Sequence, residues 1–231
     1  SGRRWTGPNI SVDRQAEMIL QETNFSSAMA NVLARLGVEA NQAKNYIKPS
    51  LRDLMPNPLK ILDMEKAASR VNIAVNNHER IAIFADYDVD GATSGALLHD
   101  WLTQLGNIPT LYVPDRIEEG YGPNIEAMET LANVHDLIIC VDCGTLSHET
   151  INKITNTDII ILDHHLGGET LPNAYAVVNP NRQDEKGDLY YLCAAGVVFL
   201  TLVAANSIRR NNNKSTPDLL NMLDLVALGT V

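Results

Sequence analysis

Three aspartates stand at alternate positions directly after a short apolar run. The run is Ile81–Ala85, and the aspartates are Asp86, Asp88 and Asp90. A run without a polar face is typical of a buried strand in a parallel sheet. Carboxylates this close repel one another unless a cation lies between them, and their oxygens suit Mg²⁺ or Mn²⁺. The alternative is an acidic, solvated loop, which a single pair of aspartates would favour.

Two further apolar runs end in the same way. Leu137–Val141 is followed by Asp142, and residues 159–162 are followed by an aspartate and two histidines at 163–165. The carboxyl ends of strands in open α/β sheets form the edge at which ligands bind. Imidazole and carboxylate together suit Mn²⁺, and Mg²⁺ also fits. Two such ions roughly 4 Å apart can hold both the attacking water and the leaving oxygen of a phosphoester.

Strands and helices that could position these residues alternate from about residue 80 onwards. We expect strands at 81–85, 110–113, 137–141, 159–162 and 176–178, and helices at 92–105, 124–132, 194–208 and 217–228. This alternation predicts an α/β fold with a parallel sheet wrapped by helices. Residues 1–76 show helical patterning without a strand signal, so we expect a helical cap or docking region there and a catalytic domain at 77–231. The prolines between 50 and 58 predict an extended linker.

Composition limits the class of protein. The 231 residues carry a net charge of -10, which argues against a broad basic surface for nucleic acid but leaves room for a local basic groove. Arg3, Arg4 and Trp5 could touch a phosphate backbone or form an ordinary surface patch. Cys140 and Cys143 form a C-x-x-C, which suggests redox chemistry or zinc. The sparse, odd cysteine count favours structural thiols in a reducing cytoplasm instead. No stretch is long and apolar enough to predict a membrane span.

The ordered motifs resemble those of a known superfamily. They are Asp86-Tyr87-Asp88-Val89-Asp90-Gly91, Val141-Asp142-Cys143-Gly144 and Asp163-His164-His165, and together they resemble the DHH phosphoesterase superfamily. Further phrases narrow the resemblance to the bacterial branch that degrades single-stranded DNA from the 5′ end. These phrases are Val113 to Gly122, Asn179-Pro180-Asn181 and Cys193 to Val197. The resemblance covers residues 77–231; the region before it carries no diagnostic motif.

The resemblance assigns roles to the residues of these motifs. It implies metal binding by Asp86, Asp88, Asp90, Asp142 and His164. We expect Asp142 to be the ligand shared by two ions. The expected catalytic residues are Asp142, Asp86 and His165. His165 is expected to touch the scissile phosphate and assist the leaving oxygen, or else to orient His164. Asp163 is expected to orient a histidine rather than bind metal.

Substrate contacts are expected outside the metal ligands as well. Arg116 could bind a phosphate through its guanidinium, and the alternative is an ion pair with Glu118 or Glu119. Thr93 and Ser94 lie where a helix begins beside the metals, so free backbone N–H groups there could receive a phosphate. The small residues could equally serve close packing.

The resemblance implies a metal-dependent hydrolase that degrades single-stranded DNA from the 5′ end to mononucleotides, in recombination and repair. The implied cofactor is Mn²⁺ or Mg²⁺, and the implied partners are single-stranded DNA, a single-strand-binding protein and a helicase, with a monomeric, cytoplasmic protein. The alternatives are a DHH-type phosphodiesterase for short oligonucleotides or cyclic dinucleotides, and a non-catalytic replication scaffold.

The sequence departs from the superfamily pattern at one point. There the last metal-binding aspartate follows shortly after a phrase like Leu228-Gly229-Thr230-Val231, where this sequence stops. We therefore expect the catalytic domain to be truncated, without the second catalytic domain and the strand-binding module. The fragment alone could then be inactive.

Overall fold

The computed structural model describes residues 2, 7 and 9–231, and the chain divides into two compact units, Ser1–Pro56 and Asn57–Val231. The expectation for Arg3, Arg4 and Trp5 lies outside the described residues. The units are separated at Pro56, whereas the sequence suggested a division after residue 76. The reason is that helix α5 (Met64–Asn76) packs against helix α9 (Ala194–Asn211) and strand β5 (Ala176–Val178), so it belongs with the second unit.

The first unit is helical, as its sequence predicts. Helix α1 (Ile10–Glu22) begins at Asn9, whose side chain accepts the N–H of Val12, and α2 (Ser27–Arg35) begins at Ser26 in the same manner. The unit also contains three short helical segments, η1 (Ala40–Gln42), α3 (Ala43–Ile47) and α4 (Leu51–Leu54). The last of these lies inside the segment that was expected to be extended. The core of the unit is small and consists of Ala16, Ile19, Ala30, Leu33, Ala34, Val38, Ala40 and Ala43.

The second unit is built on a five-stranded sheet of order β2-β1-β3-β4-β5, in which every neighbouring pair is parallel. The strands are β1 (Ile81–Ala85), β2 (Thr110–Tyr112), β3 (Leu137–Val141), β4 (Asp158–Leu162) and β5. The α/β prediction is confirmed. β2 lies on one side of β1, and β3, β4 and β5 follow on the other side, so the direction in which strands are added reverses between β1 and β3. Ligands bind at such a reversal in open α/β sheets.

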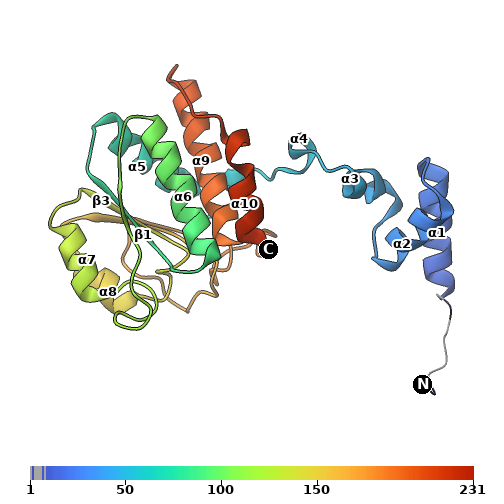
Figure 1. Ribbon diagram of the computed structural model, residues 1–231, viewed down its shortest axis with the longest axis horizontal. Helices are drawn as coiled ribbons and strands as arrows, with labels where there is room; N and C mark the ends of the chain where they lie inside the picture. The colour runs from blue at the N-terminus through green and yellow to red at the C-terminus, as the bar shows by residue number, and fades with distance from the viewer. Residues whose placement is uncertain (1, 3–6, 8) are drawn as a thin grey trace. The chain divides into compact units, whose positions relative to one another are not determined.

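Helices cover both faces of this sheet, and the strand residues alternate between the two cores (Figure 1). Ile81, Ile83 and Ala85 of β1 face the core made with α5, α6 (Val89–Gln104) and α9. Ala82 and Phe84 face the smaller core made with α7 (Ile125–Ala132) and α8 (His148–Lys153). Burial on both faces explains why the strands are apolar at every position.

The remaining elements of the second unit complete the layer beside α6. A short turn of helix, η2 (Pro58–Lys60), precedes α5; η3 (Leu219–Met222) leads into α10 (Leu223–Thr230), which packs on α6 and α9. Gly229 lies very close to its neighbours, since a Cβ there would be 2.6 Å from Thr93 Oγ1 and 2.7 Å from Ala195 Cβ. Among the described residues, no helix combines the length and the apolar character needed to cross a membrane.

Candidate metal centre

The register of the sheet brings the acidic residues to one level. Ala85 pairs with Val141, and Val141 pairs with Leu162, so the next residue of each strand lies at the same edge. Backbone hydrogen bonds continue the ladder one step further: the N–H of Asp86 donates to Val141 at 3.3 Å, and that of Asp142 donates to Leu162 at 2.9 Å. The predicted convergence of the three strand ends is therefore observed.

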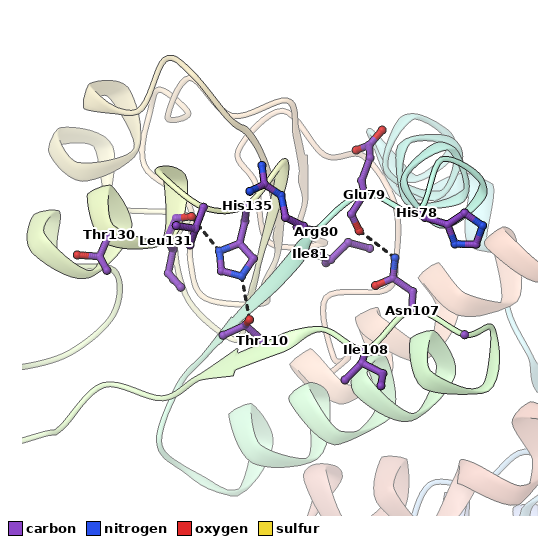
Figure 2. A pocket seen from close by; sticks show the side chains of 12 residues that line it. His78, Glu79, Arg80, Ile81, Asn107, Ile108, Thr110, Thr130, Leu131 and His135 are labelled. Carbon is purple, nitrogen blue, oxygen red and sulfur yellow. Dashed lines mark hydrogen bonds between the residues drawn. The ribbon is translucent and has the colours of Figure 1, made fainter.

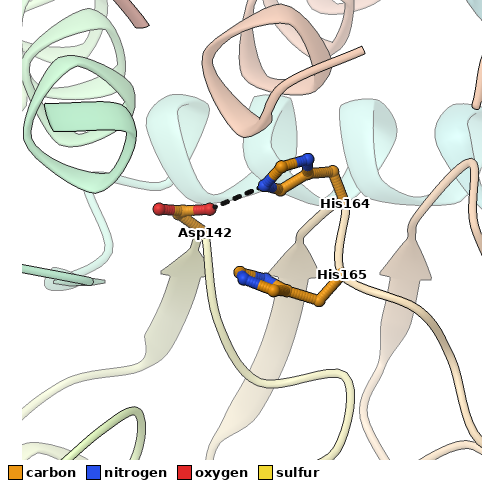
Figure 3. Close-up of side chains that lie close together, drawn as sticks. All are labelled: Asp142, His164 and His165. Carbon is orange, nitrogen blue, oxygen red and sulfur yellow. Dashed lines mark ion pairs between the residues drawn. The ribbon is translucent and has the colours of Figure 1, made fainter. Parts of the chain in front are cut away.

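Asp142 lies at the middle of this edge and is 1% exposed (Figure 3). Neither carboxylate oxygen has a hydrogen-bond partner within the described part of the chain. His164 lies close by: its Nε2 is 3.3 Å from Oδ1, without good hydrogen-bond geometry. Burial raises the pKa of Asp142 to about 7. A buried carboxylate without hydrogen-bond partners lowers the stability of the folded protein, and a bound cation would satisfy both oxygens.

Asp142 is also the residue that joins two candidate ligand groups. Asp86, Asp88 and Asp142 each place an oxygen within 4.8 Å of the others, and Asp142 forms a second such group with His164 and His165. Asp86 Oδ1 is buried without a partner in the described structure, and burial raises the pKa of this carboxyl. These donor sets are carboxylates with imidazole, which fits Mn²⁺ and also Mg²⁺.

Asp88 and Asp90 each hold a helix end in addition to facing this edge. Asp88 Oδ1 accepts the N–H of Gly91 at 2.9 Å and so begins α6 three residues earlier than predicted. The two oxygens of Asp90 accept the N–H groups of Ala194 and Ala195, both at 2.7 Å, at the start of α9. Asp90 Oδ2 is also 3.5 Å from His164 Nε2. Asp90 thus connects α6, α9 and the histidine.

Asp163 orients the histidine loop, as expected from the sequence. Its Oδ1 accepts the N–H of His164 at 2.7 Å and lies 2.8 Å from His165 Nδ1, and its Oδ2 accepts the N–H of Thr145 at 3.0 Å. The hydrogen bond to Asp163 raises the pKa of His165 to about 9. This contact favours the protonated form of the imidazole and leaves its Nε2 free of Asp163.

A tyrosine beside His165, Tyr121, and a second one that packs against it, Tyr87, were missed by the sequence reasoning. The hydroxyl of Tyr121 lies 3.2 Å from His165 Nε2 and 3.4 Å from the carbonyl oxygen of Asp142. Its ring meets the ring of Tyr87 edge to face, with 6.4 Å between the ring centres. Burial raises the pKa of Tyr121, so its hydroxyl stays protonated. The phrase containing Tyr121 was used to narrow the family, but nothing in it shows that the loop folds over the histidine.

Arg116 lies on the same side of the site. Its guanidinium is 5.5 Å from the centre of the Tyr87 ring, a cation–π contact. In the part of the chain that the structure describes, no ion pair joins Arg116 to Glu118 or Glu119. Glu119 instead accepts hydrogen bonds from the N–H of Asp115 and from Asn124. The contacts thus give no support to the ion-pair alternative.

Thr93 and Ser94 are buried at 4% and 0% exposure. The Thr93 hydroxyl donates within its own helix to the carbonyl oxygen of Val89 at 2.8 Å. Gly91 also lies against its neighbours, because a Cβ there would be 2.3 Å from the carbonyl oxygen of Asp86. These contacts favour close packing over phosphate binding at the start of α6, an alternative that the sequence left open.

A hollow of about 720 Å³ lies at the opposite edge of the sheet, beside the amino ends of β1 and β2 (Figure 2). Two of its polar side chains are already engaged. Both ring nitrogens of His135 are engaged, at 2.9 Å from the Leu131 carbonyl oxygen and 2.8 Å from Thr110 Oγ1, and Arg80 pairs with Asp136 at 2.8 Å. The carboxyl edge, by contrast, gathers carboxylates and imidazoles within 4.8 Å of one another.

The cysteines play no visible part in the metal centre. Cys140 and Cys143 are buried and all three thiols are free. Cys140 packs in the core beneath α7 and α8, and burial raises its pKa. The interpretation of these residues as structural thiols agrees with their position.

Comparison with known proteins agrees with the geometry. Residues 80–230 match the DHH family, N-terminal domain. The chain is 32% identical over 235 residues to the single-stranded-DNA-specific exonuclease RecJ of Bacillus subtilis. The aligned region covers 100% of this chain and 28% of that relative. It is 36% identical over 214 residues to RecJ of Escherichia coli, covering 88% of this chain and 36% of the relative. The chain thus spans about a third of the length of these relatives.

Solved structures show the same likeness. RecJ from Thermus thermophilus in complex with Mn²⁺ matches 94% of this chain and 30% of that chain, with a TM-score of 0.74 and 27% identity. A second structure, exonuclease RecJ bound to manganese, matches 74% of this chain and 43% of that chain, with a TM-score of 0.65 and 32% identity. The parallel sheet, the acidic strand ends and the family match lead to one conclusion: the chain belongs to the DHH family, and residues 80–230 form the N-terminal domain of that family.

Proposed function

We propose that the protein hydrolyses single-stranded DNA from the 5′ end to mononucleotides, with divalent metal ions bound at the carboxyl edge of the sheet. The observation that carries the proposal is the cluster of buried carboxylate oxygens of Asp86 and Asp142, which lack hydrogen-bond partners among the described residues. The relatives named above are single-stranded-DNA-specific exonucleases, and solved RecJ structures hold Mn²⁺ or Mg²⁺.

The metal would be held by Asp86, Asp88, Asp90, Asp142 and His164. Asp142 belongs to both candidate ligand groups, which supports it as the ligand shared by two ions. When bound, Mn²⁺ or Mg²⁺ would supply Lewis-acid chemistry, drawing electron density from the phosphoryl oxygens. Asp90 would hold its ligand geometry through the two N–H groups of α9.

His165 would act on the leaving group. Attack of water on phosphorus breaks the bond to the 3′ oxygen of the terminal nucleotide, and that oxygen must gain a proton. Asp163 raises the pKa of His165 and so favours its protonated form, and Asp163 engages Nδ1 rather than Nε2. The imidazole can therefore donate the proton at Nε2 while Asp163 holds Nδ1.

Arg116 would contact a phosphate of the strand. In the described ranges, its guanidinium forms no ion pair with Glu118 or Glu119 and lies over the ring of Tyr87. Tyr87 in turn contacts Tyr121, which contacts His165. A guanidinium binds phosphate bidentately. A local contact of this kind is compatible with the net charge of -10.

Wider expectations form part of the same proposal. A cytoplasmic location is supported by the three free cysteines. Roles in recombination and repair, a monomeric state, and association with a single-strand-binding protein and a helicase stay predictions that depend on the likeness to RecJ.

The test is a nuclease assay on the intact protein with Mn²⁺ and with Mg²⁺. The substrates are 5′-phosphorylated single-stranded DNA, duplex DNA and a dinucleotide, and Asp142→Ala is the inactive control. Stepwise release of mononucleotides from single strands, lost in Asp142→Ala, is the expected result. Cleavage of the dinucleotide alone would favour a phosphodiesterase for small substrates. The absence of metal-dependent hydrolysis would favour a scaffold.

A further inference from the structure

Two adjacent tyrosines, Tyr190 and Tyr191, protrude from the second unit close to the metal centre. Their side chains are 68% and 65% exposed, and the rings meet edge to face with 6.1 Å between their centres. They follow Leu189, which is 4% exposed, and precede Leu192, which packs on the core. The buried Leu189 and the half-buried Leu192 thus anchor a segment whose aromatic rings lie in solvent.

This segment is a tight turn, which makes the choice of tyrosine unusual. The N–H of Leu192 donates to the carbonyl oxygen of Leu189 at 3.1 Å, so Tyr190 and Tyr191 are the two central residues of the turn. Glycine, proline, asparagine, aspartate and serine dominate such positions for conformational reasons. Turn geometry does not call for two aromatic rings here, and the adjacent exposed rings form a surface on which a planar group can stack.

Two contacts connect the turn to the metal centre. The side-chain amide of Asn181 donates to the carbonyl oxygen of His164 at 2.5 Å and to that of Tyr190 at 3.3 Å. Beyond the turn, Cys193 begins α9, whose first N–H groups bind Asp90. The tyrosines are therefore held at the same edge of the sheet as the candidate ligands.

The charges around the turn point away from phosphate binding. Residues 182–188 contain three acidic and two basic side chains, and one of the basic ones, Arg182, is paired with both Asp63 and Asp184. A nucleic acid that reaches this surface would find aromatic faces and few free cations. Unpaired bases stack on such faces regardless of sequence.

We infer that Tyr190 and Tyr191 form a base-stacking platform that holds single-stranded nucleic acid beside the metal centre, an inference that rests on the proposed function. The platform contributes to the choice of single strands, because the bases of a duplex are already stacked on one another and cannot pack onto the rings. Tyr190 and Tyr191 are thus specificity-determining residues, whereas the metal centre performs the chemistry.

The test measures binding of the intact protein in EDTA, so that no strand is cleaved. The probe is a fluorescently labelled oligothymidylate of twelve nucleotides, compared with versions in which a single nucleotide lacks its base. The double variant Tyr190→Ala/Tyr191→Ala is expected to bind the intact probe about tenfold more weakly, within the range seen when one base-stacking ring is removed. Removing the contacted base should weaken the wild-type protein similarly and leave the double variant unchanged, because both changes delete the same contact.

Matched variants separate stacking from other effects. Tyr190→Phe/Tyr191→Phe keeps both rings and should bind like the wild type. Ile108→Ala removes an exposed apolar side chain at the opposite edge of the sheet and should have no effect. Loss of stacking should also leave the salt dependence of binding unchanged, whereas loss of one phosphate contact would lower its slope by about 0.7.

The outcomes distinguish this inference from the proposed function. If the wild type and the double alanine variant bind the single strand equally, the inference of a stacking platform is wrong, while the exonuclease proposal stands. If the wild type binds no single strand, the platform is also wrong, and the separate hydrolysis assay decides on the enzyme. An equal loss of binding to intact and abasic probes would show a role other than stacking and would overturn the inference.

Discussion

His165 Nδ1 lies 2.8 Å from Asp163 Oδ1, and the same oxygen accepts the backbone N–H of His165 at 3.1 Å. One carboxylate oxygen therefore fixes both the ring and the chain that carries it. Asp163 is 1% exposed, so water does not compete for these bonds. The imidazole is held in an orientation in which Asp163 engages Nδ1 and the Tyr121 hydroxyl lies 3.4 Å from Nδ1 and 3.2 Å from Nε2.

Asp163→Asn tests this arrangement. The change keeps the shape of the side chain but removes the charge that keeps His165 protonated. We expect the turnover number to fall by roughly 10- to 100-fold, as is usual when the partner of a ligand or catalytic imidazole is replaced, with little change in KM. The matched control is Glu149→Gln, which removes an exposed carboxylate paired with Lys153 and should be silent. Unchanged turnover in Asp163→Asn would contradict the role given to His165.

Tyr121→Phe removes only the hydroxyl that contacts His165 Nε2 and the Asp142 carbonyl. The ring and its edge-to-face contact with Tyr87 stay. We expect turnover to fall by up to about tenfold, since one hydrogen bond typically contributes roughly 0.5–1.5 kcal/mol. Tyr175→Phe is the control, because that residue lies away from the carboxyl edge, near Lys66. Equal turnover for Tyr121→Phe and the wild type would show that this hydroxyl does not position the histidine.

Metal addition should stabilise the wild-type protein and leave Asp142→Asn unaffected. Binding to the folded state alone adds about 2.7 kcal/mol when the free ion is at 100 times its Kd. The backbone of Asp142 has φ +60°, which asparagine adopts readily, so the variant should fold. Thermal unfolding with Mn²⁺ and with EDTA measures the effect, and Asp100→Asn on the exposed side of α6 is the control. A full Mn²⁺-dependent shift in Asp142→Asn would remove this residue from the metal site.

Gly91→Ala should destabilise the second unit. A Cβ at this position would be 2.3 Å from the carbonyl oxygen of Asp86, a backbone atom that cannot yield without moving the candidate metal ligands. We expect a loss of about 1–3 kcal/mol, as for other overpacked sites. At Gly95 the nearest atoms are side-chain carbons at 3.3 Å, so Gly95→Ala should cost less. Urea unfolding of both variants provides the comparison, and equal stability of the two would show that the close approach at Gly91 is relieved.

The Arg80–Asp136 pair at the opposite edge predicts a pH dependence of stability. Hydrogen bonds from Arg80 lower the pKa of Asp136 to about 2, below its ordinary value of 3.8. The pair therefore stabilises the fold above pH 3.8, and this contribution is lost as the pH falls through about 2. Wild type and Arg80→Gln should differ in Tm at pH 6 and converge towards pH 2.5. Lys153→Gln is the surface control, and a gap that does not narrow at low pH would contradict the prediction.

The sequence predicts the sheet better than it predicts the loops around the site. Strands 81–85, 137–141 and 176–178 are found at the predicted residues, because strands buried on both faces must be apolar throughout. Helix α6 begins earlier than predicted, since Asp88 serves as its cap. The short helix α8 was not predicted; with six residues it has too few positions to show a helical period.

The candidate site was predictable where it depends on strand ends and unpredictable where it depends on tertiary contacts. The parallel order of the sheet is sufficient to bring Asp86, Asp142 and Asp163 together. The approach of Tyr121 to His165 requires a loop to fold over the site, and no spacing in the chain records that. Likewise, only the packed structure shows that Thr93 and Ser94 are buried.

The register of the three central strands also limits how such a chain can change over generations. Asp86, Asp142 and Asp163 each follow a strand whose last residues are paired side by side. Inserting or deleting one residue within β1, β3 or β4 would displace that acid by about 3.3 Å along the strand and turn its side chain to the other face. Surface connections tolerate insertions and deletions far better. Homologous chains that keep this site can therefore vary in loop length, but the lengths of these three strands must stay the same.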